Sequence, residues 1–592
     1  MECVLNVACS VSKKKWVQRT GKVQNPERII SAIMQRHRLP EVIARCLVGR
    51  DVDLDDIDLF LSPKMRDSMP DPYCLKGMQE AVDTSVQKII EGGSIGLFAD
   101  YDVDGASSAA LLMRFFKMLK VETILYIPDR IEEGYGPNNV GFSKLKAAGA
   151  KLIFTLDCGI LAFDVLEKAS NDGCEVIVID HHMAEADLPA AKSIINPNRL
   201  DDDSELGELA AVGVCFLFLV ALNRRLREIG WYNKGLMEPN LLKLLDLVAL
   251  GTVCDVVPLR GLNRAFVSQG LKVIGNRSNL GLRILSDIAK IEKKTDAYQL
   301  GFVLGPRINA GGRVGLPDAG ARLLSSNDPL ESVELAKILD ANNSTRKEIE
   351  ALVLEEAILQ VEKNNLEDSV LVVSGKNWHP GVIGIIAARL KEKYNRPACV
   401  ISLIGNSGKG SARSVPLWDL GANIMSALQS GLLTAGGGHA MAAGFSIEEQ
   451  KINLLRDFLC NRFSERVELT GKLQELKLDG VLSVEGVKED IIRALGVLEP
   501  FGSNNPEPIF GLPSVRVTYS SVVGDKHIRC NLKSSDGATL KGIAFRALDT
   551  EIGEVLLNHN NASLNVAGKI RENNWQGRNS SQIIIEDIAL AN

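Results

Sequence analysis

Between about residues 76 and 280, short apolar runs alternate with segments whose apolar residues recur every three or four positions. The short runs are SIGLF (94–98), TILYIP (123–128), KLIFTLD (151–157) and EVIVID (175–180). The helical patterns include SSAALLMRFFKMLK (107–120) and FDVLEKASNDG (163–173). Strand and helix patterns in alternation predict a βαβ array around a parallel sheet.

Two further patterns follow this array. Residues 330–365 combine helical apolar spacing with mixed charge, which predicts a long helix or helix pair joining two domains. A second α/β unit is predicted from SVLVVSG (369–375) to GFSIEE (444–449). From about residue 470 to residue 592, short alternating segments predict a small antiparallel barrel of OB-fold type.

The predicted fold class is therefore α/β, with a parallel-sheet domain and a smaller α/β domain joined by a long helix, plus a C-terminal OB-like β-barrel. The expected domain boundaries are an N-terminal segment (1–75), the parallel-sheet domain (76–325), a helical linker (326–368), the smaller α/β domain (369–465) and the barrel (466–592). A chain of 592 residues is too long for one hydrophobic core, which agrees with several domains.

Composition narrows the possible functions. The formal net charge of −6 means that any contact with nucleic acid must come from local basic patches. The eleven cysteines form no CxxC pair, which argues against a zinc ribbon and fits a reducing cytoplasm. The longest apolar run, residues 209–222, is too short to span a bilayer and predicts a buried helix. We therefore expect a cytoplasmic protein without a membrane partner.

Acidic residues and a histidine pair follow two of the predicted strands. Asp100, Asp102 and Asp104 come after the first strand, and His181 and His182 come after the run that ends in Asp180. Parallel strands present their carboxyl ends at one edge of the sheet, where ligands bind in such folds. Carboxylates brought together there would repel each other strongly unless a cation lay among them.

Asp157 and Asp255 extend this constellation, because each ends another apolar run. Mixed carboxylate and imidazole ligands suit Mn²⁺, or Mg²⁺ when waters fill the other positions. The ligands suffice for two divalent metal ions, with Asp157 or Asp102 between them. Two ions about 4 Å apart would clamp the attacking and leaving oxygens of a phosphodiester. Any one Asp taken alone is as well explained as a helix N-cap or loop residue.

A second constellation lies in residues 375–445. A glycine-rich turn precedes a predicted helix there, and a helix N-terminus with free N–H groups attracts anions. Glycines also allow the chain to approach a ligand closely, although tight turns alone would need them too. The candidate substrate-binding residues of this region are His379, Ser411, Arg413, Gly437, Gly438 and His439.

Four short motifs, DYDVDG, LDCG, DHH and CDVVPL, resemble the motifs of the DHH phosphoesterase family. Longer segments resemble the RecJ branch of that family, which contains 5′ to 3′ exonucleases specific for single strands. These segments are IPDRIEEGYGPN (127–138), GPRINAGGRVG (305–315), WHPGVIGIIAARL (378–390), GKGSARS (408–414), GGGHAMAAGF (436–445) and LEPFGSNNPEPIF (498–510). The resemblance covers nearly the whole chain from about residue 60. Its departures, at Ser503, Asn504 and Gly311, are minor.

The resemblance implies roles for individual residues. The implied metal ligands are Asp102, Asp104, Asp157, His181 and Asp255, with Asp100 beside them at a position where more distant members have another residue. Asp102, Asp157 and His182 are the implied catalytic residues; for His182 the sequence leaves open a metal ligand, an orienting group or a phosphate contact. Arg307 and Asn309 suit a phosphate or a base edge, although domain packing would also explain the arginine.

The resemblance implies hydrolysis of single-stranded DNA from the 5′ end to mononucleotides, in DNA repair and recombination. Single-stranded DNA is the expected partner, together with a single-strand-binding protein and a helicase. The barrel would extend the grip on the strand, with Lys526, His527, Arg529, Phe545 and Arg546 as candidate contacts. One alternative is an oligonucleotide or cyclic-dinucleotide phosphodiesterase, whose members usually lack the barrel. A non-catalytic replication scaffold is disfavoured because every ligand position is filled.

Overall fold

The computed structural model describes residues 3–292, 295–364, 366–416, 418–467, 474–558, 562–575 and 578–591. The chain divides into two compact units. We call the first the barrel unit; it comprises Met1–Met69, Val256–Gln269 and Lys472–Asn592. We call the second the core unit; it comprises Pro70–Asp255 and Gly270–Gly471. Within the described residues, no helix combines the length and the apolar character needed to cross a membrane.

The first half of the core unit is built on a five-stranded sheet with the order β3-β2-β4-β5-β6, in which every pairing is parallel. The strands are β2 (Ser94–Ala99), β3 (Thr123–Tyr126), β4 (Ala150–Leu156), β5 (Val176–Ile179) and β6 (Ser193–Ile195). The last five residues of β2 and all four residues of β5 are buried, as expected for a sheet covered on both faces.

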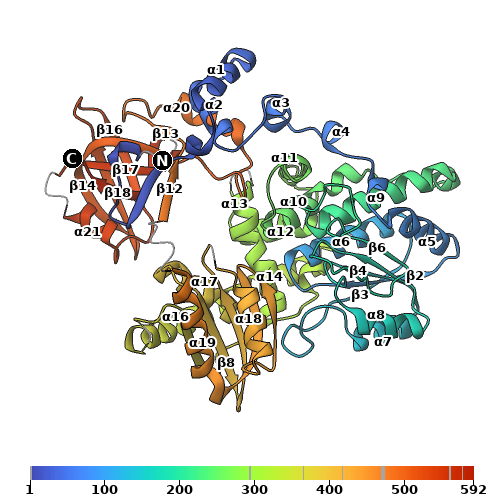
Figure 1. Ribbon diagram of the computed structural model, residues 1–592. Helices are drawn as coiled ribbons and strands as arrows, with labels where there is room; N and C mark the ends of the chain where they lie inside the picture. The colour runs from blue at the N-terminus through green and yellow to red at the C-terminus, as the bar shows by residue number, and fades with distance from the viewer. Residues whose placement is uncertain are drawn as a thin grey trace. The chain divides into compact units, whose positions relative to one another are not determined.

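Helices cover both faces of this sheet (Figure 1). On one face lie α7 (Asn139–Ala147) and α8 (Phe163–Asn171), whose apolar sides pack on Phe98, Ile153 and Val178. On the other face lie α5 (Met78–Ile90), α6 (Val103–Met118) and α9 (Ala211–Glu228). The apolar run at residues 209–222 falls in α9 and is buried, as predicted. Helix α10 (Leu245–Cys254) packs against α6 and α9 and completes this half.

The second half of the core unit is a mixed sheet with the order β10-β11-β9-β8-β7. Its strands are β7 (Leu371–Lys376), β8 (Ala398–Ile404), β9 (Ser407–Arg413), β10 (Ala435–His439) and β11 (Ala442–Glu448). Helix α17 (Ile383–Tyr394) packs on one face, together with the end of α16. Helices α18 (Leu420–Gln429) and α19 (Ile452–Val467) pack on the other.

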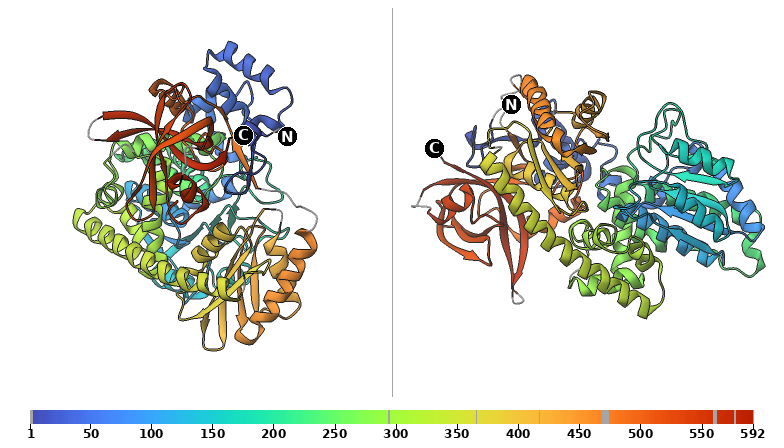
Figure 2. Two further views of the ribbon diagram at one scale, coloured as in Figure 1. Left: turned by 90° about the vertical axis from the view of Figure 1, so that its left-hand side faces the viewer. Right: turned by 90° about the horizontal axis from the view of Figure 1, so that it is seen from below.

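A single long helix, α16 (Pro329–Asn364), connects the two halves of the core unit, and it is the long yellow-green helix in Figure 2. It confirms the predicted helical connection at residues 330–365. Shorter helices precede it: α11 (Gly261–Gly275), α12 (Leu280–Ile288), α13 (Ala297–Gln299), a π-helical turn η6 (Leu300–Leu304), α14 (Gly305–Val314) and α15 (Ala319–Ser325). Of these, α11 begins in the barrel unit and ends in the core unit.

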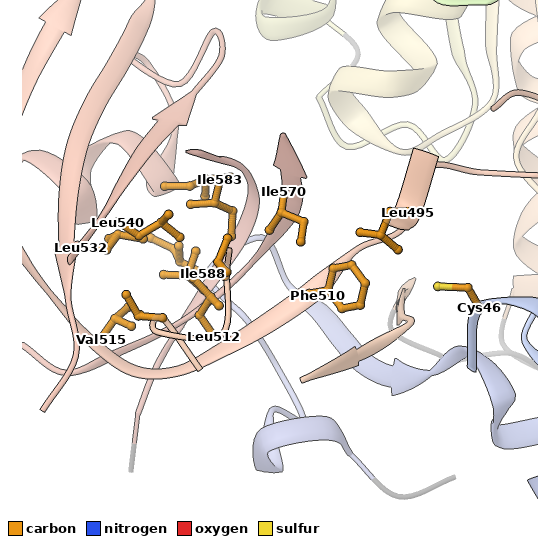
Figure 3. Close-up of a cluster of buried hydrophobic side chains, with 14 of the residues drawn as sticks. Cys46, Leu495, Phe510, Leu512, Val515, Leu532, Leu540, Ile570, Ile583 and Ile588 are labelled. Atoms are coloured by element: carbon orange, nitrogen blue, oxygen red, sulfur yellow. The ribbon is translucent and has the colours of Figure 1, made fainter. Parts of the chain in front are cut away.

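The barrel unit contains a closed five-stranded barrel. Its strands are β14 (Phe510–Val523), β15 (His527–Lys533), β16 (Thr539–Ala544), β17 (Leu564–Trp575) and β18 (Arg578–Leu590). They pair in the order β14-β15-β16-β18-β17, and β17 pairs again with β14, which closes the barrel. Alternate residues of each strand fill the interior, and Figure 3 shows Leu512, Leu532, Leu540 and Ile583 among them. Together with the two sheets, this barrel confirms the predicted fold class, although the pair β16–β18 is parallel where an antiparallel barrel was predicted.

The N-terminal residues are built into the barrel unit. Strand β1 (Lys14–Gln18) pairs in parallel with β12 (Gln474–Leu478), and β13 (Gly480–Val481) follows and pairs with β14. Helices α1 (Pro26–His37), α2 (Glu41–Val48) and α3 (Ile57–Leu61) share one apolar core with the barrel, as Cys46 and Leu495 show in Figure 3. Three shorter helices complete the unit: α4 (Met65–Ser68), α20 (Glu489–Leu495) and α21 (Glu551–Leu557).

Candidate metal centre

The first acidic motif lies between the end of β2 and the start of α6. Asp100 follows β2 and is buried, and Asp102 is the N-cap of α6, where its Oδ1 accepts a 3.0 Å hydrogen bond from the Gly105 amide. A Cβ at Gly105 would lie only 2.4 Å from the Asp100 carbonyl oxygen. The motif therefore needs glycine at this position, because the helix must begin directly against the strand end.

Asp157 is held at the end of β4 in an unusual backbone conformation. Its φ is +61°, in the left-handed region that non-glycine residues seldom adopt. Its amide donates a 3.0 Å hydrogen bond to the Ile179 carbonyl of the neighbouring strand end. Gly159 also has positive φ, and a Cβ there would lie 2.6 Å from Oγ1 of Thr155. Strained residues of this kind are concentrated at functional sites.

Asp180, the first residue of the histidine motif, is fully engaged by hydrogen-bond donors. Its Oδ1 accepts from the His181 amide at 2.7 Å and the His182 amide at 3.2 Å, and Oδ2 accepts from the Ile160 amide at 3.0 Å. The Nδ1 atom of His182 lies 2.7 Å from Oδ1. Asp180 thus orients His182 through Nδ1 and leaves Nε2 for another partner.

The remaining acidic residues surround His181. Its Nε2 lies 3.3 Å from Oδ1 of Asp157 and 3.6 Å from Oδ2 of Asp255, the C-cap residue of α10. Asp104 lies in the first turn of α6, and its carboxylate accepts hydrogen bonds from the Ala211 and Val212 amides at the start of α9. Three helices and two strand ends therefore converge on His181.

The ligand atoms fall into three overlapping groups, and within each group the atoms lie within 4.8 Å of one another. The groups are Asp100, Asp102 and Asp157; Asp157, His181 and His182; and Asp104, His181 and Asp255. All seven side chains of the predicted constellation are therefore brought together. Asp157 and His181 are the residues that the groups share.

The structure provides a physical test of whether these residues suit a cation. Among the described residues, the buried Oδ1 atoms of Asp100 and Asp157 accept no hydrogen bond, although Nε2 of His181 lies 3.3 Å from that of Asp157. A buried carboxylate oxygen without a donor is costly, and a cation removes that cost. Carboxylate and imidazole donors are the ligands that Mn²⁺ and Mg²⁺ accept. The set fits divalent cations.

The pKa values of these side chains show how much negative charge is crowded here. Burial and the neighbouring Asp102 raise the pKa of Asp104 to about 7 and those of Asp100 and Asp157 well above their usual range. Burial, with Asp104 and Asp102 nearby, raises the pKa of Asp255 to about 9. Where no cation lies among them, burial and mutual repulsion thus disfavour the charged forms of these carboxylates.

The two histidines differ in protonation. Burial and the adjacent His182 lower the pKa of His181 to about 4, so its ring is neutral, as a metal ligand must be. Burial opposes the charged form of His182 as well, but the hydrogen bond to Asp180 and the surrounding carboxylates outweigh it and raise the pKa of His182 to about 9. His181 thus has the character of a ligand, and His182 that of a cationic contact.

An arginine cluster faces the metal centre, and sequence reasoning identified only one of its members. Arg130, Arg313 and Arg413 form no ion pair with a carboxylate among the described residues. Burial lowers the pKa of Arg313 to about 10 and also lowers that of Arg413, and in both the charge of Arg130 adds to the effect. The three guanidinium groups therefore form a region of positive charge that suits phosphate.

Aromatic rings line the same region. The Arg130 guanidinium lies 4.9 Å from the ring centroid of Tyr101, inside the first acidic motif. The Tyr135 hydroxyl lies 3.3 Å from the Asp157 carbonyl oxygen and 3.4 Å from Nε2 of His182. Arg130 and Tyr135 both come from the segment IPDRIEEGYGPN, which gave no chemical signal beyond the resemblance.

The mixed sheet carries most of the predicted substrate-binding residues on one face. Ser411 and Arg413 are alternate residues of β9, so their side chains point to the same side. Ser411 lies in register with Gly444 and Gly437, and Arg413 with Ala442 and His439. Gly438, between Gly437 and His439, has its φ at +154° and is exposed. This face therefore combines polar side chains with a glycine surface.

His379 joins this face just before α17. Its Nδ1 accepts a 3.1 Å hydrogen bond from the Gly381 amide, and the Gly381 carbonyl accepts one of 2.8 Å from Arg313. A Cβ at Gly384 would lie 3.1 Å from Ser411 Oγ and 3.2 Å from Nη2 of Arg413. The predicted glycine-rich turn therefore brings the mixed sheet against the arginine cluster.

Arg307 and Asn309 lie on α14. The Arg307 guanidinium binds Asp340 at 2.8 Å and the Val303 carbonyl at 2.7 Å, a geometry that accords with the packing alternative. Asn309 is half-buried. Two glycines seat α14 on the metal motifs: a Cβ at Gly305 would lie 2.5 Å from Sγ of Cys254, and one at Gly312 would lie 2.7 Å from the Tyr101 carbonyl oxygen.

Comparison with protein families agrees with this arrangement. The model of the DHH family N-terminal domain matches residues 94–252, that of the DHHA1 domain matches residues 367–465, and that of the RecJ OB domain matches residues 478–587. A carboxylate and histidine cluster at the carboxyl edge of a parallel sheet, opposite a second α/β domain, defines a phosphoesterase of the DHH class.

Curated relatives identify the branch. The chain is 37% identical to the single-stranded-DNA-specific exonuclease RecJ of Escherichia coli (strain K12), over 87% of this chain and 90% of the relative. It is 32% identical to the protein of the same name from Bacillus subtilis (strain 168), over 98% of this chain and 71% of the relative. The chain belongs to the RecJ family of single-stranded-DNA-specific exonucleases.

Solved structures agree as well. The crystal structure of RecJ from Thermus thermophilus in complex with Mn²⁺ is 28% identical, covers 95% of this chain and 78% of its own, and superimposes with a TM-score of 0.78. The structure of the Mg²⁺ complex from the same organism is 27% identical in sequence and covers 95% of this chain and 77% of its own. Its TM-score is 0.74.

Proposed function

We propose that the chain removes mononucleotides from the 5′ end of single-stranded DNA, with two divalent ions, Mn²⁺ or Mg²⁺, held by the metal centre. The observation that carries this proposal is the pair of buried carboxylate oxygens, on Asp100 and Asp157, that no described donor satisfies, beside the arginine cluster. The acidic oxygens would bind the cations, and the arginines would bind phosphate groups of the strand next to the P–O bond that is hydrolysed.

The sharing of ligands supports two ions rather than one. Asp157 belongs to the group with Asp100 and Asp102 and also to the group with His181, and His181 continues into the group with Asp104 and Asp255. Asp100, Asp102 and Asp157 would hold one ion, and Asp104, His181 and Asp255 would hold the other. When bound, the ions supply a Lewis acid for the phosphoryl oxygen and activate the attacking water.

The protein's own side chains then hold the substrate. His182, which Asp180 orients through Nδ1, is proposed to donate from Nε2 to a phosphate oxygen. Arg413, Ser411 and His379 on the mixed sheet are proposed to bind the backbone on the other side, with Gly437, Gly438 and His439 as the adjoining surface. Asn309 stays a proposed contact, whereas the paired guanidinium of Arg307 suits packing of α14 against α16.

The barrel is proposed to extend the grip on long strands. A cavity of about 410 Å³ on the barrel unit is lined by Lys14, Phe545 and Arg546 among others. Phe545 is exposed, and its ring stands edge-to-face on His527 with 5.2 Å between centroids. The lining combines Lys13, Lys14 and Arg546 with Glu551 and Glu586, and its cations with the exposed ring suit a single strand. Lys526 and Arg529 are exposed nearby in sequence and are further candidates.

The experiment that tests this proposal is digestion of labelled single strands blocked at the 5′ end, at the 3′ end or at neither, with Mn²⁺ or Mg²⁺. Release of mononucleotides from every strand except the 5′-blocked one is expected. Hydrolysis that starts at the 3′ end would contradict the proposed polarity. Calorimetric titration with Mn²⁺ should show two ions in wild type and weakened binding of one of them in Asp255→Asn; one ion in wild type would contradict the two-ion assignment.

Substrate length separates this proposal from the oligonucleotide or cyclic-dinucleotide phosphodiesterase. Removal of the whole barrel is unsuitable, because β12 of that region pairs with β1 and Asp479 binds Arg19 and Arg50. Phe545→Leu with Arg546→Ala should instead weaken hydrolysis of long strands at low salt and leave a dinucleotide unaffected. A preference of the intact protein for the dinucleotide would favour the alternative.

Two further expectations rest on less direct support. A single-strand-binding protein and a helicase are proposed as partners on the family resemblance, and stimulation of digestion on strands coated with the binding protein would test the first. A reducing, cytoplasmic location is proposed because all eleven cysteines are free. Retention of activity in strong reductant, and its loss under oxidation, would accord with that location.

A further inference from the structure

Tyr298 and Phe302 form a stacked pair of aromatic rings on the surface of the core unit, outside the metal centre. Their centroids lie 4.9 Å apart with an interplanar angle of 26°. The residues are 58% and 71% exposed. Single exposed apolar side chains need no explanation, but two rings held nearly parallel present an ordered apolar surface to water.

The backbone holds this pair in place. Asp296 and Gln299 form a capping box at the start of α13, with hydrogen bonds of 2.9 and 2.8 Å. The π-helical turn η6 follows directly, and its Leu300 and Leu304 are buried while the rings are exposed. Single π-helical turns are rare and often occur at functional sites. The rings are therefore ordered before any ligand arrives.

The same helical run leads to the metal centre. The Cys254 thiol lies 3.5 Å from the Leu300 carbonyl, and the next residue is the candidate ligand Asp255. In the other direction the run continues through α14 to Arg313 of the arginine cluster. Phe302 and Arg313 are eleven residues apart, about 16 Å at the rise of an α-helix. The rings thus lie on the same helical run as Arg313 but are no part of the metal centre.

We propose that Tyr298 and Phe302 are a stacking platform for unpaired bases of the substrate strand, away from the scissile bond. This inference rests on the proposed function, because it takes single-stranded DNA as the molecule held at the metal centre. An aromatic ring pair offers flat apolar faces and no cation, so it suits a base rather than a phosphate. In a duplex the base faces are already stacked on their neighbours and cannot reach the rings, so the platform also favours single strands over duplexes.

Base stacking can be separated from other roles by substrates that lack bases. Fluorescence anisotropy with metal chelated would measure binding of a thymidine strand and of an abasic strand of equal length. Wild type should bind the thymidine strand about tenfold more tightly, in keeping with about 1–3 kcal/mol per stacked base. Phe302→Leu and Tyr298→Leu should lose that difference, and Phe302→Trp should keep it.

Leucine keeps an apolar side chain without an aromatic face, so the Leu variants test stacking and not apolar contact. Leu330→Ala removes another exposed apolar side chain of the core unit and should change neither affinity. Equal weakening of both strands by Phe302→Leu would overturn the proposal. An unchanged affinity for the thymidine strand in that variant would also overturn it and would point to a protein partner.

A second measurement keeps the test valid if a variant is poorly folded. A single abasic unit is moved along the strand from the 5′ end, and hydrolysis by wild type should slow when it lies a few nucleotides downstream of that end. Phe302→Leu should lose this position dependence and still hydrolyse a dinucleotide at the wild-type rate. Loss of dinucleotide hydrolysis would overturn the platform. Failure of wild type to digest single strands would instead overturn the proposed function.

Discussion

Asp157 in the core unit and Asp479 in the barrel unit are equally buried carboxylates with opposite surroundings. Asp479 accepts hydrogen bonds from Arg19 at 3.0 Å, Arg50 at 2.8 Å and the Ile509 amide at 3.0 Å. Asp157 lies among other carboxylates, and its Oδ1 receives no hydrogen bond from any described residue. One charge is neutralised within the fold, and the other is left for a cation from solution.

The difference alone does not divide the buried acids, because Asp104 accepts backbone hydrogen bonds at both oxygens and still belongs to a ligand group, whereas Asp180 belongs to none. Asp180 lies within the metal centre, yet donors engage both of its oxygens, as they do in Asp479. We therefore place Asp180 among the orienting residues. A buried carboxylate with hydrogen-bond donors helps to hold its neighbours in one arrangement. A buried carboxylate without donors destabilises the folded state until a cation binds to it.

The largest expected effect comes from Asp157→Asn. Hydrolysis should fall by about a thousandfold or more, because loss of a shared ligand removes several kcal/mol of charge stabilisation. The metal-free variant should melt at a higher temperature than metal-free wild type, because the repulsion among the carboxylates is reduced. Activity and thermal melting with and without EDTA measure both. A variant that kept a tenth of the activity would show that the unsatisfied oxygen is not a ligand.

The corresponding change in the barrel unit, Asp479→Asn, should act on stability instead. The buried side chain of Arg50 and the half-buried one of Arg19 would lose their counter-charge, which costs about 3 kcal/mol. Urea denaturation measures the loss, and Lys569→Met at the partly exposed Lys569–Glu586 pair should cost less than about 1 kcal/mol. Equal costs for the two substitutions would mean that the Asp479 network contributes little more than a surface pair.

Asp180→Asn should give an intermediate effect on catalysis. The amide keeps one acceptor oxygen but cannot hold His182 as a carboxylate does, so kcat should fall about 10–100-fold. Affinity for Mn²⁺, measured by calorimetry, should change little because Asp180 is not a ligand. A large loss of metal affinity with unchanged kcat in saturating metal would move Asp180 to the metal-binding group.

The smallest expected effect comes from Arg413→Ala, and Arg307→Ala is its matched control. Arg413 has no carboxylate partner among the described residues, so its loss should weaken strand binding about tenfold and reduce the salt dependence by about one charge. Arg307 is paired with Asp340, so its loss should change neither. Binding isotherms across a salt series test both. A reduced salt slope for Arg307→Ala would return it to the substrate contacts.

The sequence predicted that these acidic and histidine side chains lie together, because its signals are local. Most candidate ligands directly follow a strand of the parallel sheet or open the helix after it, and parallel strands bring such positions to one edge. Asp255 instead comes from the end of helix α10. The arginine cluster was only partly predicted. Arg130 and Arg313 occur singly in segments without periodic pattern, and their meeting with Arg413 depends on how α14 and the mixed sheet pack.

In the barrel unit the sequence predicted the strands but not all of their pairings. Its strands were recognisable from alternation, but nothing local to Lys14–Gln18 indicates that it pairs with Gln474–Leu478. The stacked pair of Tyr298 and Phe302 was also missed, since spacing of four residues in an apolar helix equally predicts two core residues. Pairing across long separations and the exposure of an apolar residue are decided by the tertiary fold.

The barrel unit is built from three separate segments of the chain, and this affects how the protein folds during synthesis. Arg19 and Asp479 are 460 residues apart, so strand β1 leaves the ribosome long before its partner β12 exists. At about 5–20 residues per second the delay is roughly 25–90 s. During that interval the apolar residues of the first three helices have no barrel to pack on, and they are exposed to chaperones and proteases. A ribosome that stops before residue 472 releases a chain whose N-terminal segment cannot complete its fold, which favours removal of the truncated nuclease.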